Sequence, residues 1–166
     1  MAIFTWKDAP VPNNMEISQV YGIIFTIDGR ILLRVEEDKD YKKYSLAGGR
    51  PEPYDKDIED TCRREILEEI NTTIEKPVYI GYQLVDDEDG SPAYAQVRMA
   101  AIISKVGPVR PDTDNGKVYK RFLTTPDRAI ELLDWGEVGE KQIISAVKVL
   151  QKNCGLTLKS TVEEWA

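Results

Sequence analysis

The sequence predicts an α+β domain built in layers around a mixed β-sheet. Segments with strand character come as two hairpins, and helical segments lie between the hairpins and after the second one. Of the 166 residues, 42% are hydrophobic and 31% are charged, a balance that supports a buried core and excludes a disordered chain. We therefore expect one domain over 1–166, with an irregular lead-in at 1–16 and a peripheral tail at 155–166.

The first hairpin is predicted from two apolar runs, residues 20–27 and 30–35, rich in β-branched, aromatic and aliphatic side chains. Asp28 and Gly29 separate the runs, and an Asp-Gly pair in this position is a strong signal for a two-residue turn. The two strands should therefore pair antiparallel. A short strand is expected next, over 44–47.

A central helix, a second hairpin and two closing helices account for most of the remaining chain. We expect a helix over about 58–70 that ends at Asn71, strands over 78–85 and 93–106 joined by an acidic loop, a short strand over 119–123, a helix over 127–133 capped by Asp127, and a helix over about 139–153.

Composition excludes several kinds of chemistry and partner. Histidine is absent, which excludes imidazole bases and the common zinc sites. The two cysteines, Cys62 and Cys154, are too few for a disulfide framework, so we expect a cytoplasmic protein. The formal charge of −7 (22 basic against 29 acidic residues) disfavours nucleic acid and anionic membranes, and no apolar run is long enough to span a bilayer. The chemistry must use carboxylates, Lys, Arg, Tyr or a metal held by oxygen.

The helix over 58–70 has charges on its apolar side. With about 100° per residue, the apolar residues span an arc of roughly 120° that starts at Ile58. Glu69 falls about 20° into that arc and Glu65 lies about 20° outside its edge. Carboxylates four residues apart repel each other, so a cation is expected between them. Mg²⁺ prefers such oxygens, accompanies phosphate-bearing substrates, and allows the carboxylates to hold and deprotonate a water molecule.

A purely structural interpretation of this helix stays open. In it, Glu65, Glu68 and Glu69 form a solvated face and pair with Arg63 and Arg64 along the helix. Charge runs on helices usually face water. The position of Glu69 inside the apolar arc and the Gly-Gly pair before the helix favour the functional interpretation.

Residues 48–72, GGRPEPYDKDIEDTCRREILEEINT, resemble the Nudix box, whose pattern is G-x5-E-x7-R-E-U-x-E-E-x-G-U with U an aliphatic residue. The segment at 64–69 matches R-E-U-x-E-E at every defined position. Gly48, Gly49 and Glu52 match the usual approach to the box. The order of elements over about 18–153 is also similar to that of the family.

The resemblance implies an α/β/α sandwich and a hydrolase like the MutT-like nucleoside diphosphate-X pyrophosphohydrolases. Such an enzyme would use Mg²⁺ or Mn²⁺ to cleave a pyrophosphate bond in a small nucleotide, such as a nucleoside triphosphate, a nucleotide sugar or a dinucleotide. Carried over by position, the principal metal ligands would be Glu65 and Glu69, and Glu68 would be a further ligand or the group that handles water. Arg64 would orient the glutamates through charge-assisted hydrogen bonds. A backbone carbonyl of Gly48 or Gly49 would complete the metal shell.

The sequence departs from the box in its first half. Asp55 follows Gly49 after five residues, but eight rather than seven residues separate it from Arg64. Either Asp55 or Asp57 therefore stands for the first box glutamate, and Asp57 is also the expected N-cap of the helix. Asn71 replaces the family's glycine at the helix end, a position where asparagine is the usual second choice.

Outside the helix, the candidate substrate-binding residues are Arg34, Arg98 and Glu52. Both arginines lie in predicted strands, where they either reach phosphates or pair with nearby acids. Candidates for stacking on a base, with core packing as the alternative, are Tyr21, Tyr82, Tyr94 and Trp135.

Two functional hypotheses follow. The first is a metal-dependent hydrolase of small nucleotides. The alternative is a catalytically impaired Nudix-like module that senses a nucleotide, which the altered loop would allow. A long polyanion such as RNA is a less natural substrate for a chain of charge −7. A homodimer stays open, because this fold often pairs.

Overall fold

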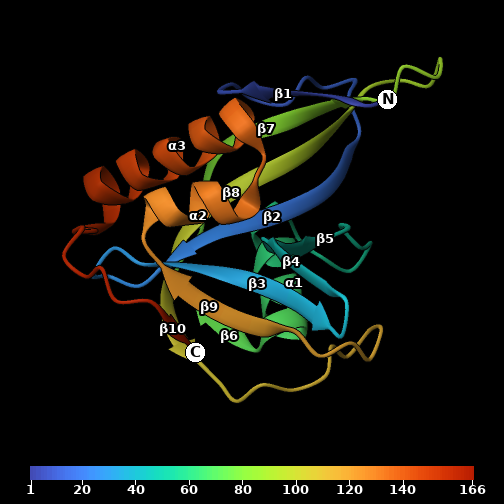
Figure 1. Cartoon of the computed structure of the whole chain (residues 1–166). Coiled ribbons are helices and arrows are strands. Elements are labelled where there is room, and N and C mark those ends of the chain that lie inside the picture. The colour runs from blue at the N-terminus through green and yellow to red at the C-terminus, as the bar shows by residue number, and fades with distance from the viewer.

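The computed structural model describes all residues, 1–166, and contains three helices and ten strands (Figure 1). The helices are α1 (Ile58–Ile70), α2 (Pro126–Leu133) and α3 (Gly136–Cys154). The strands are β1 (Ile3–Lys7), β2 (Ile17–Phe25), β3 (Ile31–Asp38), β4 (Tyr41–Ser45), β5 (Ala47–Gly49), β6 (Thr72–Ile74), β7 (Val78–Asp86), β8 (Tyr94–Val106), β9 (Lys120–Thr124) and β10 (Glu164–Trp165).

The strands form a mixed sheet in the order β1-β7-β8-β2-β3-β9-β10, with β4 paired to β3, β5 to β2 and β6 to β8. Both predicted hairpins are present, because β2 pairs antiparallel with β3 and β7 pairs antiparallel with β8. The two hairpins meet through a parallel pairing of β2 with β8. This parallel pair makes the sheet mixed, as the sequence predicts.

Helices cover both faces of the sheet, as expected for an α/β/α sandwich. Figure 1 shows α2 and α3 together on one face and α1 on the other. Successive residues of a strand point to opposite faces, and β2 follows this rule. Val20 and Ile24 pack in the core under α1, whereas Ile23 and Phe25 pack in the core under α2 and α3.

Local signals set the ends of α1 where the sequence predicts them. The Asp57 carboxylate accepts a hydrogen bond from the Asp60 N–H at 2.9 Å, which makes Asp57 the N-cap. Asn71 ends the helix in the left-handed conformation, with φ of 46°. Gly22 of β2 lets the helix approach the sheet, because a Cβ atom there would lie 2.5 Å from Cδ1 of Ile66.

Both ends of the chain add strands that the sequence analysis does not predict. In the lead-in expected to be irregular, β1 pairs antiparallel with β7. The tail does not lie apart from the domain: Leu156 is buried under α3, β10 pairs with β9, and Arg121 donates to the Ala166 carbonyl at 3.1 Å. These short strands depend on pairing with distant parts of the chain, so their own residues carry little signal.

The two closing helices begin elsewhere than expected. Thr125 caps α2 in place of Asp127, since its hydroxyl oxygen accepts from the Arg128 N–H at 3.3 Å. Pro126 then occupies the first helical turn, where its missing N–H costs nothing. Helix α3 begins at Gly136 rather than Gly139. None of the helices combines the length and apolar character needed to cross a membrane.

Candidate active site

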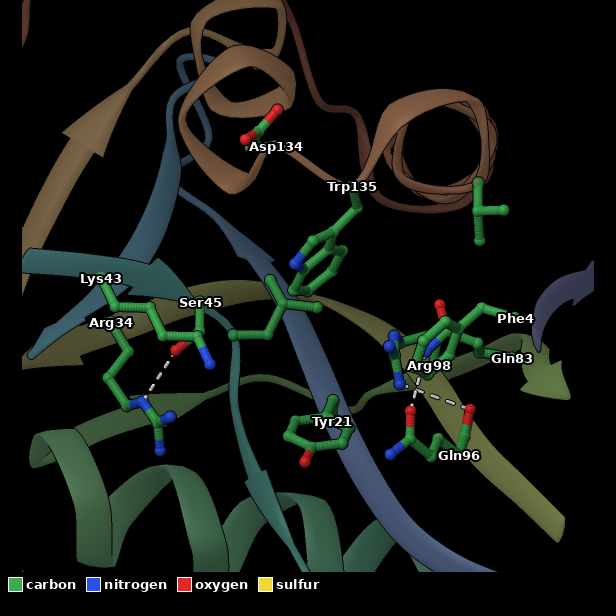
Figure 2. A pocket seen from close by; sticks show the side chains of 12 residues that line it. Phe4, Tyr21, Arg34, Lys43, Ser45, Gln83, Gln96, Arg98, Asp134 and Trp135 are labelled. Atoms are coloured by element: carbon green, nitrogen blue, oxygen red, sulfur yellow. Dashed lines mark hydrogen bonds between the residues drawn. The ribbon is translucent and has the colours of Figure 1, made fainter. Parts of the chain in front are cut away.

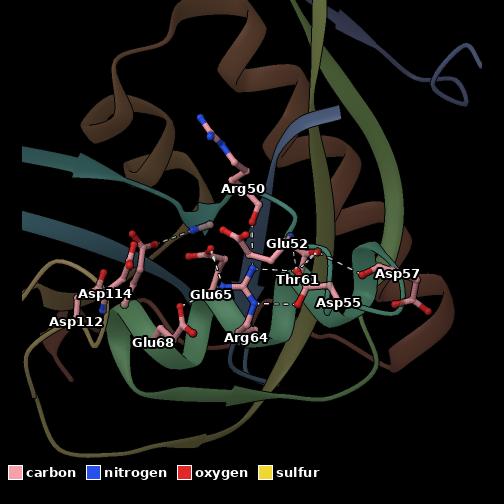
Figure 3. Close-up of polar contacts among 12 residues, drawn as sticks. Arg50, Glu52, Asp55, Asp57, Thr61, Arg64, Glu65, Glu68, Asp112 and Asp114 are labelled. Carbon is pink, nitrogen blue, oxygen red and sulfur yellow. Dashed lines mark hydrogen bonds and ion pairs between the residues drawn. The ribbon is translucent and has the colours of Figure 1, made fainter. Parts of the chain in front are cut away.

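Arg64 lies at the centre of a group of carboxylates on α1 and the loop before it (Figure 3). Its Nε and Nη2 atoms donate to the two carboxylate oxygens of Asp55, both at 2.9 Å. Its Nη1 atom donates to Glu65 at 3.0 Å and to Glu68 at 3.2 Å. One guanidinium group therefore fixes two of the predicted metal-ligating side chains and connects them to the loop.

Of the two aspartates considered for the first box glutamate, Asp55 is the one that contacts Arg64. The Asp55 carboxylate also accepts from the Glu52 N–H at 2.9 Å and from the Thr61 hydroxyl at 2.8 Å. Its hydrogen bonds with Arg64 hold the pKa of Asp55 well below its usual range. Asp57 caps the helix instead. The extra loop residue is thus accommodated without loss of the acid that holds Arg64.

Glu69 is buried at the junction of α1 with the sheet and is only 7% exposed. Its Oε1 atom accepts from the Gly48 N–H at 2.8 Å, and its Oε2 atom lies 2.5 Å from Nη1 of Arg34. Burial raises the pKa of Glu69 to about 7, although the Arg34 charge and the Gly48 hydrogen bond act against the shift. Arg34 therefore pairs with an acid, one of the two roles considered for it.

Glu65 is half-buried against the backbone of β5. A Cβ atom placed on Gly49 would lie 2.4 Å from Cδ of Glu65, so only glycine leaves room for this carboxylate. Burial raises the pKa of Glu65, and the Arg64 charge opposes the shift. The predicted ligands Glu65 and Gly49 are thus in direct contact.

Asp112 is an acidic residue of this site that no sequence motif indicates. It is buried in the loop between β8 and β9, and Figure 3 shows it with Asp114 beside α1. Burial is the main cause of the raised pKa of Glu65 and Glu69, and the charge of Asp112 adds to it. In the sequence Asp112 belongs to an ordinary acidic loop, which gives no sign that it folds back onto the helix.

The donors at this site suit a hard divalent cation. Glu65, Glu68, Glu69 and Asp112 supply carboxylate oxygens, the ligand type that Mg²⁺ and Mn²⁺ prefer. In the structure Glu65, Glu68 and Glu69 pair with arginines, and no three acidic side chains converge on one point as a metal shell would require. Burial raises the pKa of Glu65 and of Glu69, and a bound cation would favour the ionised form of both carboxylates.

A cavity of about 530 Å³ adjoins this acidic group (Figure 2). Arg34 lines it and also pairs with Glu69, so the cavity and the acidic face of α1 share a wall. Arg98 lines the cavity as well, whereas Glu52 does not and uses its backbone N–H to bind Asp55. Of the aromatic residues considered for stacking, Tyr21 and Trp135 line the cavity; Tyr82 and Tyr94 do not.

Comparisons with known proteins agree with this architecture. The model of the NUDIX domain family matches residues 15–146. A search of curated proteins found no match. A Bacillus subtilis pyrophosphohydrolase is structurally similar, with a TM-score of 0.65 at 18% sequence identity over 92% of each chain.

Two further solved structures show the same fold. A NUDIX hydrolase from Nitrosomonas europaea has a TM-score of 0.60 at 16% identity, covering 87% of this chain and 93% of its own. The Ap4A hydrolase of C. elegans has a TM-score of 0.53 at 16% identity, covering 82% of this chain and 99% of its own. Because the family model spans most of the sequence and includes the whole of residues 48–72, the chain belongs to the NUDIX family, as the resemblance predicts.

Proposed function

We propose that this protein hydrolyses a pyrophosphate bond in a small nucleotide, with Mg²⁺ or Mn²⁺ as cofactor. The observation that carries the proposal is the position of Arg34, which pairs with Glu69 of the acidic helix and also lines the cavity. A nucleotide in the cavity would place its phosphates next to the carboxylates of α1. The substrate class is a nucleoside diphosphate joined to another group, as in a nucleoside triphosphate, nucleotide sugar or dinucleotide.

Glu65 and Glu69 are the proposed principal ligands of the cation, with Glu68 and Asp112 as further oxygen donors near it. When bound, the cation would neutralise charge that develops on phosphate oxygens and activate a water molecule. The water oxygen forms a new bond to phosphorus, the bridging P–O bond breaks, and the water proton passes to a base. The products are two phosphate compounds.

The chain's own residues prepare this site. The Asp55–Arg64 pair fixes Glu65 and Glu68 on the helix, and Gly49 leaves space for the Glu65 carboxylate. Arg34 is held by Ser45, whose hydroxyl oxygen accepts from its Nε atom at 3.0 Å. With a cation on Glu69, Arg34 is free to donate to a phosphate oxygen while it stays at the cavity wall.

The test is release of phosphate or pyrophosphate from a panel of nucleoside triphosphates, nucleotide sugars and dinucleoside polyphosphates, each with Mg²⁺, Mn²⁺ or a chelator. Hydrolysis that needs the metal would support the proposal and identify the substrate class. If no compound is hydrolysed but a nucleotide raises the melting temperature, the protein is the nucleotide-sensing module of the alternative hypothesis.

A further inference from the structure

Arg98 of β8 is a buried cation without a carboxylate partner. It is 2% exposed, and no ion pair in the structure includes it. Burial lowers the pKa of Arg98 to about 10. Its Cζ atom lies 4.8 Å from the ring centre of Tyr21 and 5.7 Å from that of Trp135. These contacts stabilise the cation but do not neutralise it.

A chain of side-chain amides begins at Arg98 and crosses the sheet. The Arg98 Nε atom donates to Gln142 of α3 at 2.8 Å, and Gln142 donates to Gln83 of β7 at 3.0 Å. Gln83 in turn donates to Gln96 at 2.8 Å, and Gln96 donates to Gln19 at 2.6 Å. A guanidinium group can only donate, so it fixes the orientation of each amide in turn. Each amide oxygen along this chain accepts one hydrogen bond.

Arg98 therefore has N–H groups that make no hydrogen bond within the chain and can donate to a ligand in the cavity. The Nη1 atom of Arg98 makes one long hydrogen bond, of 3.4 Å, to the Gln96 carbonyl and keeps a second N–H. The Nη2 atom makes no hydrogen bond within the chain, yet no fully buried side-chain nitrogen or oxygen lacks a partner. That atom must accordingly reach the cavity that Arg98 lines. Gln83 and Gln96 line the same part, and each amide accepts one hydrogen bond and donates one, so each keeps a further donor and a further lone pair. Arg98 can only donate, so a ligand group bound to it must supply acceptors.

Figure 2 shows Arg34 and Arg98 at two ends of the cavity, with Tyr21 between them. The Arg34 end adjoins Glu69, where the proposed function places the pyrophosphate. The Arg98 end then receives the group that the pyrophosphate carries. We propose that Arg98 selects this group, and that the group presents two adjacent acceptors in one plane, as the N7 and O6 atoms of guanine or a carboxylate do.

This inference rests on the proposed hydrolase function. Two kinetic comparisons test it, and each sets a substrate with paired acceptors against one without them. The first compares kcat/KM for GTP with that for ATP and for 7-deaza-GTP, which lacks the N7 acceptor. The second compares UDP-glucuronate with UDP-glucose, which lacks the carboxylate. Both are measured in the wild type and in Arg98→Lys, which keeps the charge but loses the planar pair of donors.

We expect the wild type to prefer the substrate with paired acceptors by about 10-fold or more in one of the two comparisons. Arg98→Lys should bring that ratio close to one and leave the disfavoured substrate much less affected. Preference for GTP would identify a guanine nucleotide, and preference for UDP-glucuronate would identify a carboxylate. The 7-deaza-GTP result needs no variant, so an unstable Arg98→Lys protein does not block the test.

Equal kcat/KM values in both comparisons, or a preference that Arg98→Lys leaves intact, would overturn the role of Arg98 while hydrolysis itself stands. If the wild type hydrolyses none of these compounds, it is the proposed function that fails. The selection can then be measured by binding, as the thermal shift from GMP against AMP and from UDP-glucuronate against UDP-glucose in both proteins. Equal shifts in both comparisons would overturn the inference.

Discussion

The Arg34 guanidinium on β3 lies 2.5 Å from the buried Glu69 carboxylate on α1, and this ion pair connects the acidic helix to the cavity. Arg34 also lies over the ring of Tyr119, 4.5 Å from its centre. The pair keeps Glu69 from being a buried charge without a partner, which would be costly. It also places a guanidinium group at the cavity wall, where the proposed function expects phosphates.

Buried Glu69 makes the stability of the protein depend on pH. Because burial raises the pKa of Glu69 from 4.5 to about 7, the folded state binds more protons than the unfolded state between these values. The contribution of Glu69 to the free energy of unfolding therefore falls as pH rises through this interval. Glu69→Gln removes the titration, so its stability relative to the wild type should increase from pH 4.5 to pH 8. Urea unfolding at several pH values measures this, and a constant difference would contradict it.

Asp55→Asn tests the support that the loop gives to α1. The variant loses the charge that binds Arg64 through two hydrogen bonds, and we expect a loss of about 1–3 kcal/mol in the free energy of unfolding at pH 7. The pKa of Asp55 is lowered, so its stabilising contribution is complete above the ordinary value of 3.8 and disappears as pH falls through the folded value. The difference between wild type and variant should accordingly narrow below pH 3.8. A difference that stays the same down to pH 2 would exclude this ion pair as its source.

Gly49→Ala tests the contact between β5 and the helix. The new methyl group would lie 2.4 Å from Cδ of Glu65, so the carboxylate must move. A shift of about 1 Å in a group that positions the reaction can lower kcat/KM by about 100-fold. Steady-state kinetics at saturating Mg²⁺ measure the effect, with melting temperature as the check on folding. If the folded variant has the kcat/KM of the wild type, the position of the Glu65 carboxylate does not affect hydrolysis.

The acidic helix was predictable because its signals are local. Residues 64–69 carry the motif, Asp57 and Asn71 mark the two ends, and the 3.6-residue period places Glu69 on the buried side. Asp112 was not predictable, since its place beside the helix depends on how the loop before β9 folds back. The hydrogen-bond partners of Arg34 and Arg98 could not be predicted from the sequence for the same reason, because they lie on distant parts of the chain. Only tertiary structure shows that one meets a carboxylate and the other an amide.

The tail illustrates the same limit on prediction. The sequence offers only scattered apolar residues after Gly155, yet Leu156 is 3% exposed and packs under α3, whereas Leu158 is 54% exposed. Leu156→Ala should cost about 2–5 kcal/mol of the free energy of unfolding. The matched variant Leu158→Ala should change it by no more than about 0.5 kcal/mol. Equal effects of the two substitutions would show that the tail does not contribute to the core.

The initial rate of phosphate or pyrophosphate release with Mg²⁺, measured for the wild type, Glu69→Gln and Glu140→Gln, tests whether Glu69 acts in metal-dependent hydrolysis. Glu140 is exposed on α3, so its variant makes the same change of charge far from the proposed ligands. We predict metal-dependent release by the wild type and Glu140→Gln, and a rate lower by roughly 100-fold or more for Glu69→Gln. Release by Glu69→Gln at the wild-type rate would exclude the proposed role of Glu69, and release that a chelator leaves unchanged would exclude a metal-dependent reaction.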